Sequence, residues 1–457
     1  MRPVKRRSLL SVIAVAPLAA CVREPEPSPP PSPFQPTPTP SLWPDRPGDL
    51  TSVEAVIFDG AFGRGYVDLA ANALTSEFPS VKVTVSAVTN ITAELAARFE
   101  DGATPPDLID NSGADQLAVA QMVDDFLPLD DVIACENSQG ELISDTLYAN
   151  ALDPGIVNDK LISIPYALSV YGLWYSGATF AEQGWAVPTA WDEMLALGAE
   201  AKAIDTFLFA WGDGAAHYYQ ELAISSAIKE GGDEVRVALD NLEPDGWSHP
   251  AVSGVLEQLE ACVAAGLVLY GGAFQAAQAE WSENRRALFY PSGAWIVHEV
   301  ADHTADGFEM MASPVPTLTS SPTLPIAAVH STATEAFLVP ARAANPEGGK
   351  ALLRSILNPE VAQEFTRTNL MPTVVRNSVP TDLESSALDS QTRLLADAGD
   401  NVFSWRFADY YGLAPEQDLL WAQFLSGQLT ALSLANQLQA LSDRVRNDPT
   451  VERYTVS

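Results

Sequence analysis

The stretch "FYPSGAWIV" at 289–297 places a tryptophan directly after a tight turn. Phe289 and Tyr290 favour a strand, whereas the Pro-Ser-Gly that follows favours a turn. An aromatic ring carried just past a turn can cover a flat apolar face of a ligand, while nearby carboxylates and amides bind its polar rim. Trp295 could therefore face a ligand. The alternative is a place in the core, because tryptophan is heavily buried on average.

Two polar residues stand where predicted strands end. Asp59 comes directly after "VEAVIF" at 53–58, and Asn111 comes directly after "DLID" at 107–110. In open α/β sheets, ligands bind in the crevice at the carboxyl ends of the strands. Both residues are therefore candidates for a pocket. Either could instead cap the helix that follows it.

The sequence contains no recognisable catalytic or metal-binding motif. "HEVADH" at 298–303 resembles a zinc-protease helix, but Asp302 stands where the motif needs histidine. No G-x-S-x-G motif occurs, and "GAFGRG" at 60–65 has neither phosphate-loop nor dinucleotide spacing. We expect no metal, no cofactor and no enzymatic activity. Two of the many carboxylates could still form a glycosidase pair, so a hydrolase stays open as an alternative.

Hydrophobic spacing predicts a sheet that would position these residues. Apolar residues at helical spacing follow the first strand, and the strictly alternating "VKVTV" comes next. Alternating strands and helices predict an α/β fold with a parallel sheet and right-handed crossovers. Further along, Thr189 and Asp192 have the spacing of a capping box at a helix start. The predicted elements are strands at 53–58, 81–85 and 107–110, and helices at 66–78 and 92–99.

The composition is that of a globular, acidic protein. The 457 residues are 47% hydrophobic and 18% charged, which is typical of folded domains rather than disordered chains. The length is sufficient for two or three domains. With 59 acidic and 25 basic residues, the net charge is −34. That charge argues against nucleic-acid binding, which needs a basic surface.

The N-terminus has the pattern of an export signal. Basic residues precede a short apolar run that ends in Leu-Ala-Ala-Cys at Cys21, and the adjacent arginines resemble a twin-arginine signal. The ending resembles the bacterial lipobox, so residues 1–20 would be a lipoprotein signal peptide and Cys21 the lipidated residue. The proline-rich residues 21–49 favour an extended spacer. No later segment has the ~18 consecutive apolar residues of a transmembrane helix. Cys135 and Cys262 could pair in an oxidising compartment.

The stretch "IPYALSVYGLWYSGATFAEQGWAVPTAWDEML" at 164–195 resembles the family 1 extracellular solute-binding proteins of carbohydrate ABC importers. Other segments agree and follow the family's order, among them "NRRALFYPSGAWIV", "NLMPT" and "FLSGQLTALSLANQL". The resemblance covers roughly residues 50 to 450. "HYYQEL" suggests the subgroup that binds N-acetylglucosamine and chitobiose.

The resemblance implies an α/β fold of the two-lobe, periplasmic-binding-protein-like kind (type II), with discontinuous lobes joined by hinge strands. We expect residues 50–164 and 307–340 to form the first lobe, and residues 165–306 and 341–457 to form the second. The chain would return to the first lobe near "FEMMASPVPT" and leave it near "EAFLVPARAANPEGG". A ligand that bridges the lobes would favour the closed state and shift the population presented to a transporter.

The resemblance also implies a set of ligand contacts. Trp295 takes the aromatic position of the family's pocket strand, and "FAWGDGAAHYY" and "FSWRFADYY" match further aromatic contacts. Tyr218 and Tyr219 are adjacent at a helix start, so they cannot both face the core. Tyr171 lies near a polar contact of the family, although it could pack inward from a strand. The predicted ligand-binding residues are Asp59, Asn111, Tyr171, Trp211, Tyr218, Tyr219, Trp295 and Trp405.

The implied function is a substrate-binding lipoprotein that captures a sugar or short oligosaccharide and delivers it to the permease subunits of an ABC importer. Carbohydrate ligands suit the aromatic residues, because a sugar has an apolar C–H face and a rim of hydroxyl groups. The protein would be a monomer, anchored by lipid at Cys21 on the outer face of the cytoplasmic membrane. One alternative is a glycerophosphodiester or other polar solute, for which Arg64 is the one basic candidate near a strand end. A secreted carbohydrate-active hydrolase is the other.

Overall fold

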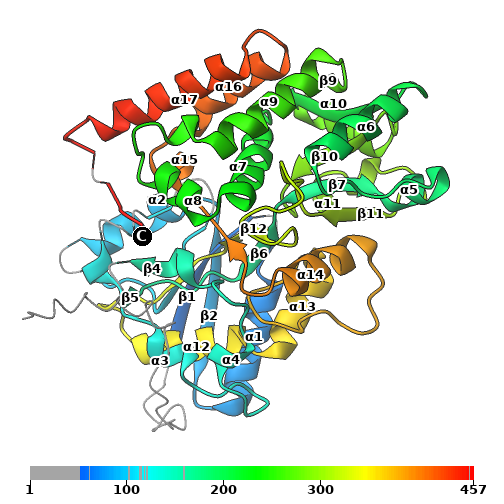
Figure 1. Ribbon diagram of the computed structural model, residues 1–457. Coiled ribbons are helices and arrows are strands. Elements are labelled where there is room, and N and C mark those ends of the chain that lie inside the picture. The colour runs from blue at the N-terminus through cyan, green and yellow to red at the C-terminus, as the bar shows by residue number, and fades with distance from the viewer. Residues whose placement is uncertain are drawn as a thin grey trace, which may run out of the picture. The chain divides into compact units, whose positions relative to one another are not determined.

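The computed structural model describes residues 52–60, 62–100, 103–112, 116–117, 119, 122–157, 160–451 and 453–456. The predicted signal peptide, the lipidation site at Cys21 and the proline-rich linker lie outside these residues. The described residues belong to one compact unit, which spans Pro38–Ser457. Figure 1 shows the path of the chain through this unit.

The first sheet has the predicted alternation of strands and helices. β1, β2 and β3 run parallel, and β13 joins β3 as an antiparallel edge strand. The order across the sheet is β13-β3-β1-β2. The predicted parallel α/β arrangement is therefore confirmed here. The bounds are β1 Ser52–Phe58, α1 Gly65–Glu77, β2 Lys82–Val88, α2 Ile91–Leu95 with a 3-10 turn at Ala96–Phe99, β3 Leu108–Asp110 and β13 Phe337–Leu338.

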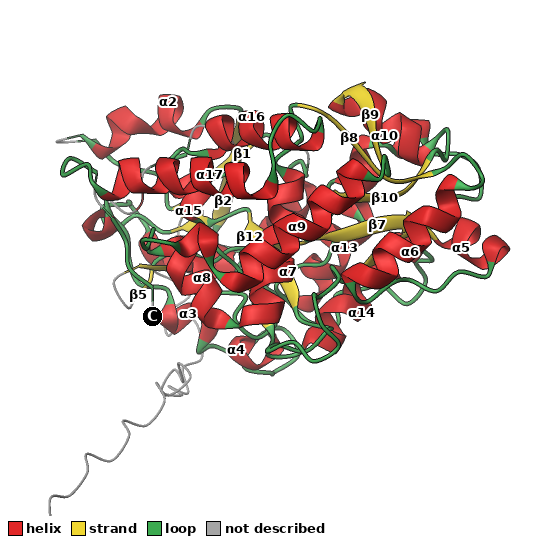
Figure 2. Ribbon diagram, turned by 45° about the horizontal axis from the view of Figure 1, so that its top comes forward, coloured by secondary structure: helices red, strands yellow, loops and turns green. Residues whose placement is uncertain are grey.

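The second sheet is mixed, in the order β11-β7-β10-β8-β9. β7 is antiparallel to β10 and β11, whereas β8 is parallel to β10 and β9. Helices α6 (Trp191–Lys202) and α10 (Phe274–Ser282) pack against β8. Helices α7 (Tyr218–Gly231), α9 (Pro250–Ala264) and α17 (Ala431–Arg446) lie side by side (Figure 2). The strand bounds are β7 Gly172–Ser176, β8 Phe207–Asp213, β9 Val268–Ala273, β10 Ala287–Ser292 and β11 Met310–Ser313.

A small sheet, β14-β12-β6, connects these two sheets along the chain. β6 (Ala167–Val170) is followed by β7 of the second sheet, and β12 (Val329–Thr334) is followed by β13 of the first. β6 and β12 are antiparallel neighbours, and β14 (Val402–Phe403) pairs with the start of β12. In Figure 1 they lie between the elements of the two larger sheets. The chain therefore crosses between the sheets at Tyr171 and at Glu335.

Strand pairing differs from the predicted lobe boundaries in two places. "FEMMASPVPT", expected in the first lobe, contains β11, which pairs with β7 of the second sheet. Helices α12 (Pro346–Ile356) and α13 (Pro359–Asn369), expected in the second lobe, both pack against α1 of the first sheet. The chain thus enters the first sheet at β13, where the sequence suggested that it leaves. The reason is that an apolar strand pattern reports burial and does not specify the sheet in which the strand pairs.

The predicted capping box is displaced by one residue. Helix α6 begins at Trp191, and the carboxylate that caps it belongs to Glu193 instead of Asp192. This carboxylate accepts the backbone N–H of Thr189 at 2.8 Å and that of Ala190 at 3.3 Å. The remaining helices are α3 Asp130–Ile133, α4 Ile143–Thr146, α5 Gly177–Gln183, α8 Asp233–Asp240, α11 Ile296–Glu299, α14 Ser386–Ala398, α15 Phe407–Tyr410 and α16 Ala414–Leu425.

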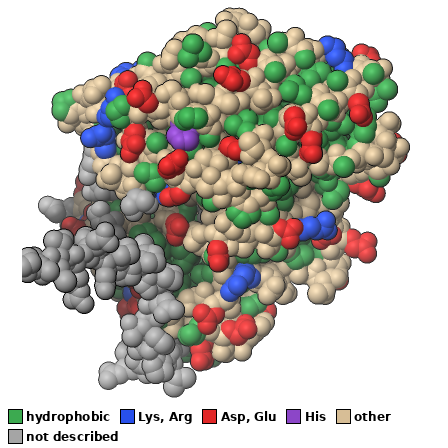
Figure 3. Space-filling view, viewed as in Figure 1, with side chains coloured by type: hydrophobic (Ala, Val, Ile, Leu, Met, Phe, Trp, Pro, Cys, Tyr) green, Lys and Arg blue, Asp and Glu red, His purple; other side chains and the backbone are tan. Residues whose placement is uncertain are grey.

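The cysteines and the surface complete the description of the fold. Cys135 and Cys262 are both buried, and they do not form with each other the disulfide that the sequence left open. Acidic side chains are scattered over the face drawn in Figure 3 and are more frequent there than basic ones. Among the described helices, none has the length and apolarity to cross a bilayer.

Candidate functional site

A cavity of about 450 Å³ opens at the carboxyl ends of β1 and β3, where the topology predicted a ligand crevice. It reaches the crossing at Glu335 and the segment after β10 that carries Trp295. Its walls therefore come from the first sheet, from the connecting strands and from the second sheet. The lining residues are Phe58, Phe62, Asn111, Ser112, Gln116, Pro154, Ser163, Pro165, Ser169, Trp295, Glu335, Ala336 and Met371.

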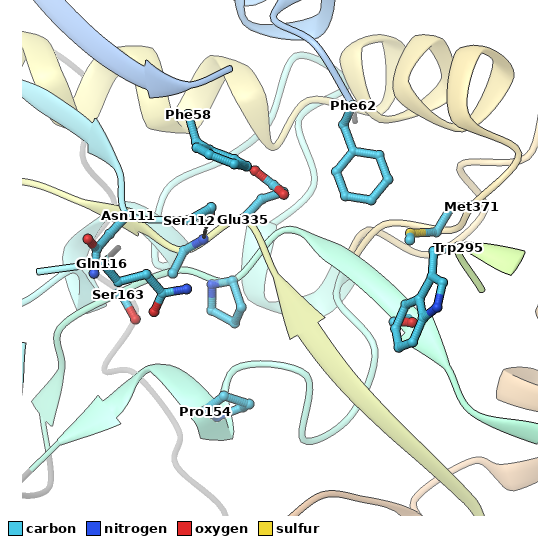
Figure 4. A pocket seen from close by; sticks show the side chains of 13 residues that line it. Phe58, Phe62, Asn111, Ser112, Gln116, Pro154, Ser163, Trp295, Glu335 and Met371 are labelled. Atoms are coloured by element: carbon cyan, nitrogen blue, oxygen red, sulfur yellow. Dashed lines mark hydrogen bonds between the residues drawn. The ribbon is translucent and has the colours of Figure 1, made fainter. Parts of the chain in front are cut away.

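The cavity has two chemically different ends. In Figure 4 the polar side chains gather at one end, around Asn111, Gln116 and Ser163. Phe62, Met371 and Trp295 stand at the other. A ligand with one apolar face and several hydroxyl groups would find partners for both features.

Trp295 owes its position to the turn before it. β10 continues through Pro291 to Ser292, and the Trp295 ring then folds back against Gly293. A Cβ atom at Gly293 would stand only 2.2 Å from the ring, so this approach requires glycine. The prediction of a turn at Pro291 and Ser292 was therefore wrong, because both residues belong to β10; the chain bends at Gly293, and Trp295 then lines the cavity.

Two tyrosines fix the orientation of this ring. The indole Nε1–H of Trp295 donates to the hydroxyl oxygen of Tyr218 at 2.9 Å. Tyr171 meets the same ring edge to face, with ring centroids 5.3 Å apart. Burial raises the pKa of Tyr218 to about 12, so its hydroxyl stays neutral. Tyr218 comes from α7, which packs on the second sheet, and Tyr171 comes from the crossing after β6, so one helix and one crossing together position Trp295.

A stack of aromatic rings continues behind Tyr171. His330 lies against Tyr171 at 4.5 Å between centroids, and Trp405 lies against His330 at 3.6 Å. His330 Nδ1 lies 3.1 Å from the carbonyl oxygen of Phe403 and Nε2 lies 3.2 Å from Glu221. Neither His330 nor Trp405 lines the cavity. The stack therefore supports the aromatic end from behind.

Asn111 lines the polar end, but its side chain is already occupied. Its Nδ2 donates to the carbonyl oxygen of Leu117 at 3.1 Å, and its Oδ1 accepts the N–H of Leu117 at 2.7 Å. This pair of bonds joins Asn111, directly after β3, to Leu117. Among the described elements, no helix begins directly after Asn111, so the described part of the chain gives no support to the capping role that the sequence left open.

Three other predicted residues lie away from the cavity. Asp59 is exposed, although Phe58 and Phe62 on either side line the wall. Tyr219 is buried, and its hydroxyl donates to the carbonyl oxygen of Ala210 at 2.9 Å. Trp211 packs on Tyr270 in a separate groove. Of the adjacent pair of tyrosines, Tyr218 therefore lies toward the cavity and Tyr219 in the core.

Sequence reasoning missed a pair of carboxyl groups beside the polar end. Glu335 lines the cavity, and the carboxyl of Asp110, the last residue of β3, is hydrogen-bonded to it. Ser112 donates its hydroxyl to Asp110 Oδ1 and accepts the N–H of Ala336 at 3.2 Å. Burial raises the pKa of both carboxyls, and the neighbouring Asp110 raises that of Glu335 further. The sequence signal that could have indicated Glu335 was its place directly before the apolar "AFLV".

The described residues contain no group of three or more His, Cys, Asp or Glu side chains arranged to hold a metal ion. The site as described is thus one of hydrogen bonds and ring contacts. This arrangement suits the reversible binding of a neutral polar ligand.

The two sheets, the paired connecting strands and the cavity beside them form the two-lobe fold of periplasmic binding proteins. Solved structures share this fold: the apo form of RafE from Streptococcus pneumoniae matches 86% of this chain and 98% of its own, with a TM-score of 0.68 and 19% identity. A chitin oligosaccharide binding protein matches 88% of this chain and 100% of its own, with a TM-score of 0.63 and 18% identity.

Sequence comparison defines the family. Residues 70–390 match the bacterial extracellular solute-binding protein family. The diacetylchitobiose binding protein NgcE of Streptomyces coelicolor is 46% identical over 411 residues, which are 89% of this chain and 87% of that protein. The chain belongs to the bacterial extracellular solute-binding proteins, a family of binding proteins rather than enzymes. The predicted fold and family are therefore confirmed.

Proposed function

We propose that this chain is the substrate-binding lipoprotein of a carbohydrate ABC importer, and that its ligand is diacetylchitobiose or a similarly short N-acetylglucosamine oligosaccharide. The observation that carries the proposal is the cavity with Trp295 at one end and hydroxyl, amide and carboxyl groups at the other. Sugars combine an apolar ring face with a rim of hydroxyls, which matches these two ends. The 46% identity to a diacetylchitobiose binding protein supports this choice of sugar.

Within this proposal, the predicted site residues have different roles. Trp295 stacks on the sugar, while Tyr171 and Tyr218 hold its ring in place. Asn111 shapes the polar end through its loop. Trp405 supports Tyr171 through His330. The cavity lining does not include Asp59, Trp211 or Tyr219, so the direct contacts that the sequence predicted for them are not part of this proposal.

An anionic ligand such as a glycerophosphodiester is disfavoured by the same cavity. Its lining residues include Glu335 and contain neither lysine nor arginine. Arg64, the one candidate near a strand end, is bonded to Asp68 at 2.9 Å and to the carbonyl oxygen of Val85 at 3.0 Å. A phosphate in this cavity would therefore lose its water without gaining a cation.

A hydrolase is disfavoured by the geometry of the carboxyl pair. The two carboxyls of a retaining glycosidase stand about 5 Å apart, on either side of the bond that they cleave. Asp110 and Glu335 are instead hydrogen-bonded to each other, and Asp110 is fully buried. They leave no room between them for a sugar.

Calorimetric titration of the exported chain, expressed without its lipid, tests the proposal. Diacetylchitobiose should bind and be recovered intact, whereas maltose and glycerophosphocholine should not bind. Binding should also raise the unfolding temperature, since ligand at a hundredfold excess over Kd stabilises the folded state by about 2.7 kcal/mol. Recovery of cleaved sugar, or binding of glycerophosphocholine alone, would refute the proposal.

We further infer that lipid at Cys21 anchors the protein to the outer face of the cytoplasmic membrane, where it delivers sugar to the permease subunits as a monomer. The support is the Leu-Ala-Ala-Cys sequence and the proline-rich spacer that follows it. Cys21→Ser should move the protein from the membrane fraction to the soluble fraction. Light scattering on the released protein should give the mass of one chain.

A further inference from the structure

Asp110 and Glu335 meet although 224 positions separate them in the sequence. Asp110 ends β3, and Glu335 stands at the crossing from β12 to β13. Their exposed fractions are 0% and 7%, so both carboxyls are almost entirely removed from water. A hydrogen bond between two carboxyl groups requires a proton on one of them, because an ionised carboxylate is only an acceptor.

The surroundings provide little else to satisfy a second negative charge. Asp110 Oδ1 accepts the Ser112 hydroxyl, while Oδ2 has no donor of good geometry among the described residues. The backbone N–H of Phe58 also donates a hydrogen bond to the carboxyl of Asp110. The titratable side chains that face the pair are Tyr66 from α1 and, next to it, Tyr166 from the segment before β6. Both are buried phenols, and burial raises the pKa of each, so neither brings a positive charge.

We propose that Asp110 and Glu335 share one proton at the cavity wall, and that this pair is a specificity element that favours neutral ligands and holds its proton more tightly when a ligand is bound. The part of this proposal that concerns ligand binding, called the ligand half below, depends on the function proposed above. The shared proton does not, since it follows from the contacts of the protein alone.

The position of Glu335 supports a role at the site. It lines the cavity and is a non-glycine residue with φ of 60°, a left-handed conformation that persists where the surrounding structure enforces it. A sugar that fills the cavity would remove the remaining water from its carboxyl. Ionisation of the pair would then cost more, so the bound state must retain the proton to higher pH than the free state.

The carboxyl pair makes the stability of the folded protein depend on pH, and the direction of that dependence follows from the raised pKa values. Each carboxyl has a raised pKa in the folded protein, so the folded chain binds more protons than the unfolded chain once the pH exceeds about 4.5, the ordinary range of a carboxyl. This contribution to stability is fully present at acidic pH and is lost as the pH rises toward the folded pKa. Replacing the protonated carboxyl by an amide removes the dependence.

Thermal unfolding without ligand, measured from pH 5 to pH 9, tests the shared proton. Glu335→Gln keeps the size and hydrogen-bonding capacity of the protonated acid, so its unfolding temperature should fall less with pH than that of the wild type. Glu182→Gln, at an exposed position on α5, is the matched control and should follow the wild type. Parallel profiles for all three proteins would overturn the shared proton.

A measurement on the wild type alone covers the case in which Glu335→Gln fails to fold. The infrared spectrum of the native protein at pH 8 should contain the C=O band of a protonated carboxylic acid, and unfolding at the same pH should abolish it. Absence of that band in the native protein would overturn the shared proton without reference to any variant.

Titration of the wild type with diacetylchitobiose across the same pH range tests the ligand half. The Kd should rise with pH, by no more than about tenfold per pH unit for one linked proton. In Glu335→Gln the rise should be smaller. Equal profiles in the two proteins would overturn the ligand half. If no sugar binds at any pH, the proposed function and the ligand half fail together, while the unfolding and infrared results still decide the shared proton.

Discussion

The two ends of the cavity are held in place in different ways. At the aromatic end, Trp295 is positioned by ring contacts and one hydrogen bond from residues of the second sheet and its crossing. At the polar end, Asn111 and Ser112 bond to the backbone of their own loop and to the crossing at Glu335. A ligand can therefore use the Trp295 ring without competing for its bonds. At the polar end, by contrast, a ligand hydroxyl that reaches Asn111 or Ser112 must share groups that already have partners.

This difference predicts where substitutions act. Changes at the aromatic end should alter affinity, since the Trp295 ring lines the cavity and would contact the sugar. Changes at the polar end should alter the loop after β3 or the proton of the carboxyl pair, and affinity only through them. The predictions that follow test this division.

Trp295→Ala should cause the largest loss of affinity. Buried aromatic contacts of this kind contribute about 2 kcal/mol or more, which corresponds to a rise in Kd of roughly thirtyfold. Titration with diacetylchitobiose measures the loss, and circular dichroism checks the fold. Trp211→Phe is the control, because Trp211 lies in a separate groove and its substitution should leave the Kd unchanged. Equal losses in the two variants would contradict the assignment of the aromatic end.

Gly293→Ala should cause the next largest loss without touching the ligand. The new Cβ would stand 2.2 Å from the Trp295 ring, so the ring must move away from the turn. We expect a rise in Kd of about tenfold and a change in tryptophan fluorescence, because the ring leaves its place beside Tyr218. Gly65→Ala is the control, because a Cβ at Gly65 would have no atom within 4 Å. Gly63→Ala is unsuitable as a control, because the positive φ of Gly63 would strain an alanine. Unchanged affinity in Gly293→Ala would show that the ring orientation is unimportant.

Much of the fold could be predicted from the sequence, because each strand and helix of the first sheet has its own local pattern. The five predicted elements between 53 and 110 all occur. The return of the chain after residue 306 could not be predicted. β11 and β13 are both short and apolar, and only their tertiary pairing assigns one to each sheet. Local patterns therefore fixed the elements, and pairing between distant strands decided their grouping.

The residues of the site can also be divided into those that the sequence could predict and those that it could not. Trp295 lines the cavity, in agreement with the position that the family resemblance implied, while its contact with a ligand stays a prediction. Asn111 could be placed at a strand end, but its bonds to Leu117 depend on the conformation of the loop. The pairing of Asp110 with Glu335 joins the end of β3 to the crossing between β12 and β13, in opposite halves of the chain, and no local pattern records it. The positions of residues could therefore be predicted from local sequence, whereas contacts between residues far apart in the chain could not.

The smallest expected change in Kd should distinguish the role of Tyr218 from that of Tyr219. Tyr218→Phe removes the acceptor of the Trp295 indole N–H, at a cost of about 1 kcal/mol, so the Kd should rise about fivefold. Tyr219→Phe removes a hydrogen bond to Ala210 in the core, so it should lower the free energy of unfolding by about 1 kcal/mol and leave the Kd unchanged. Titration and denaturant unfolding of both variants measure the two quantities. The reverse pattern would place Tyr219, instead of Tyr218, at the aromatic end.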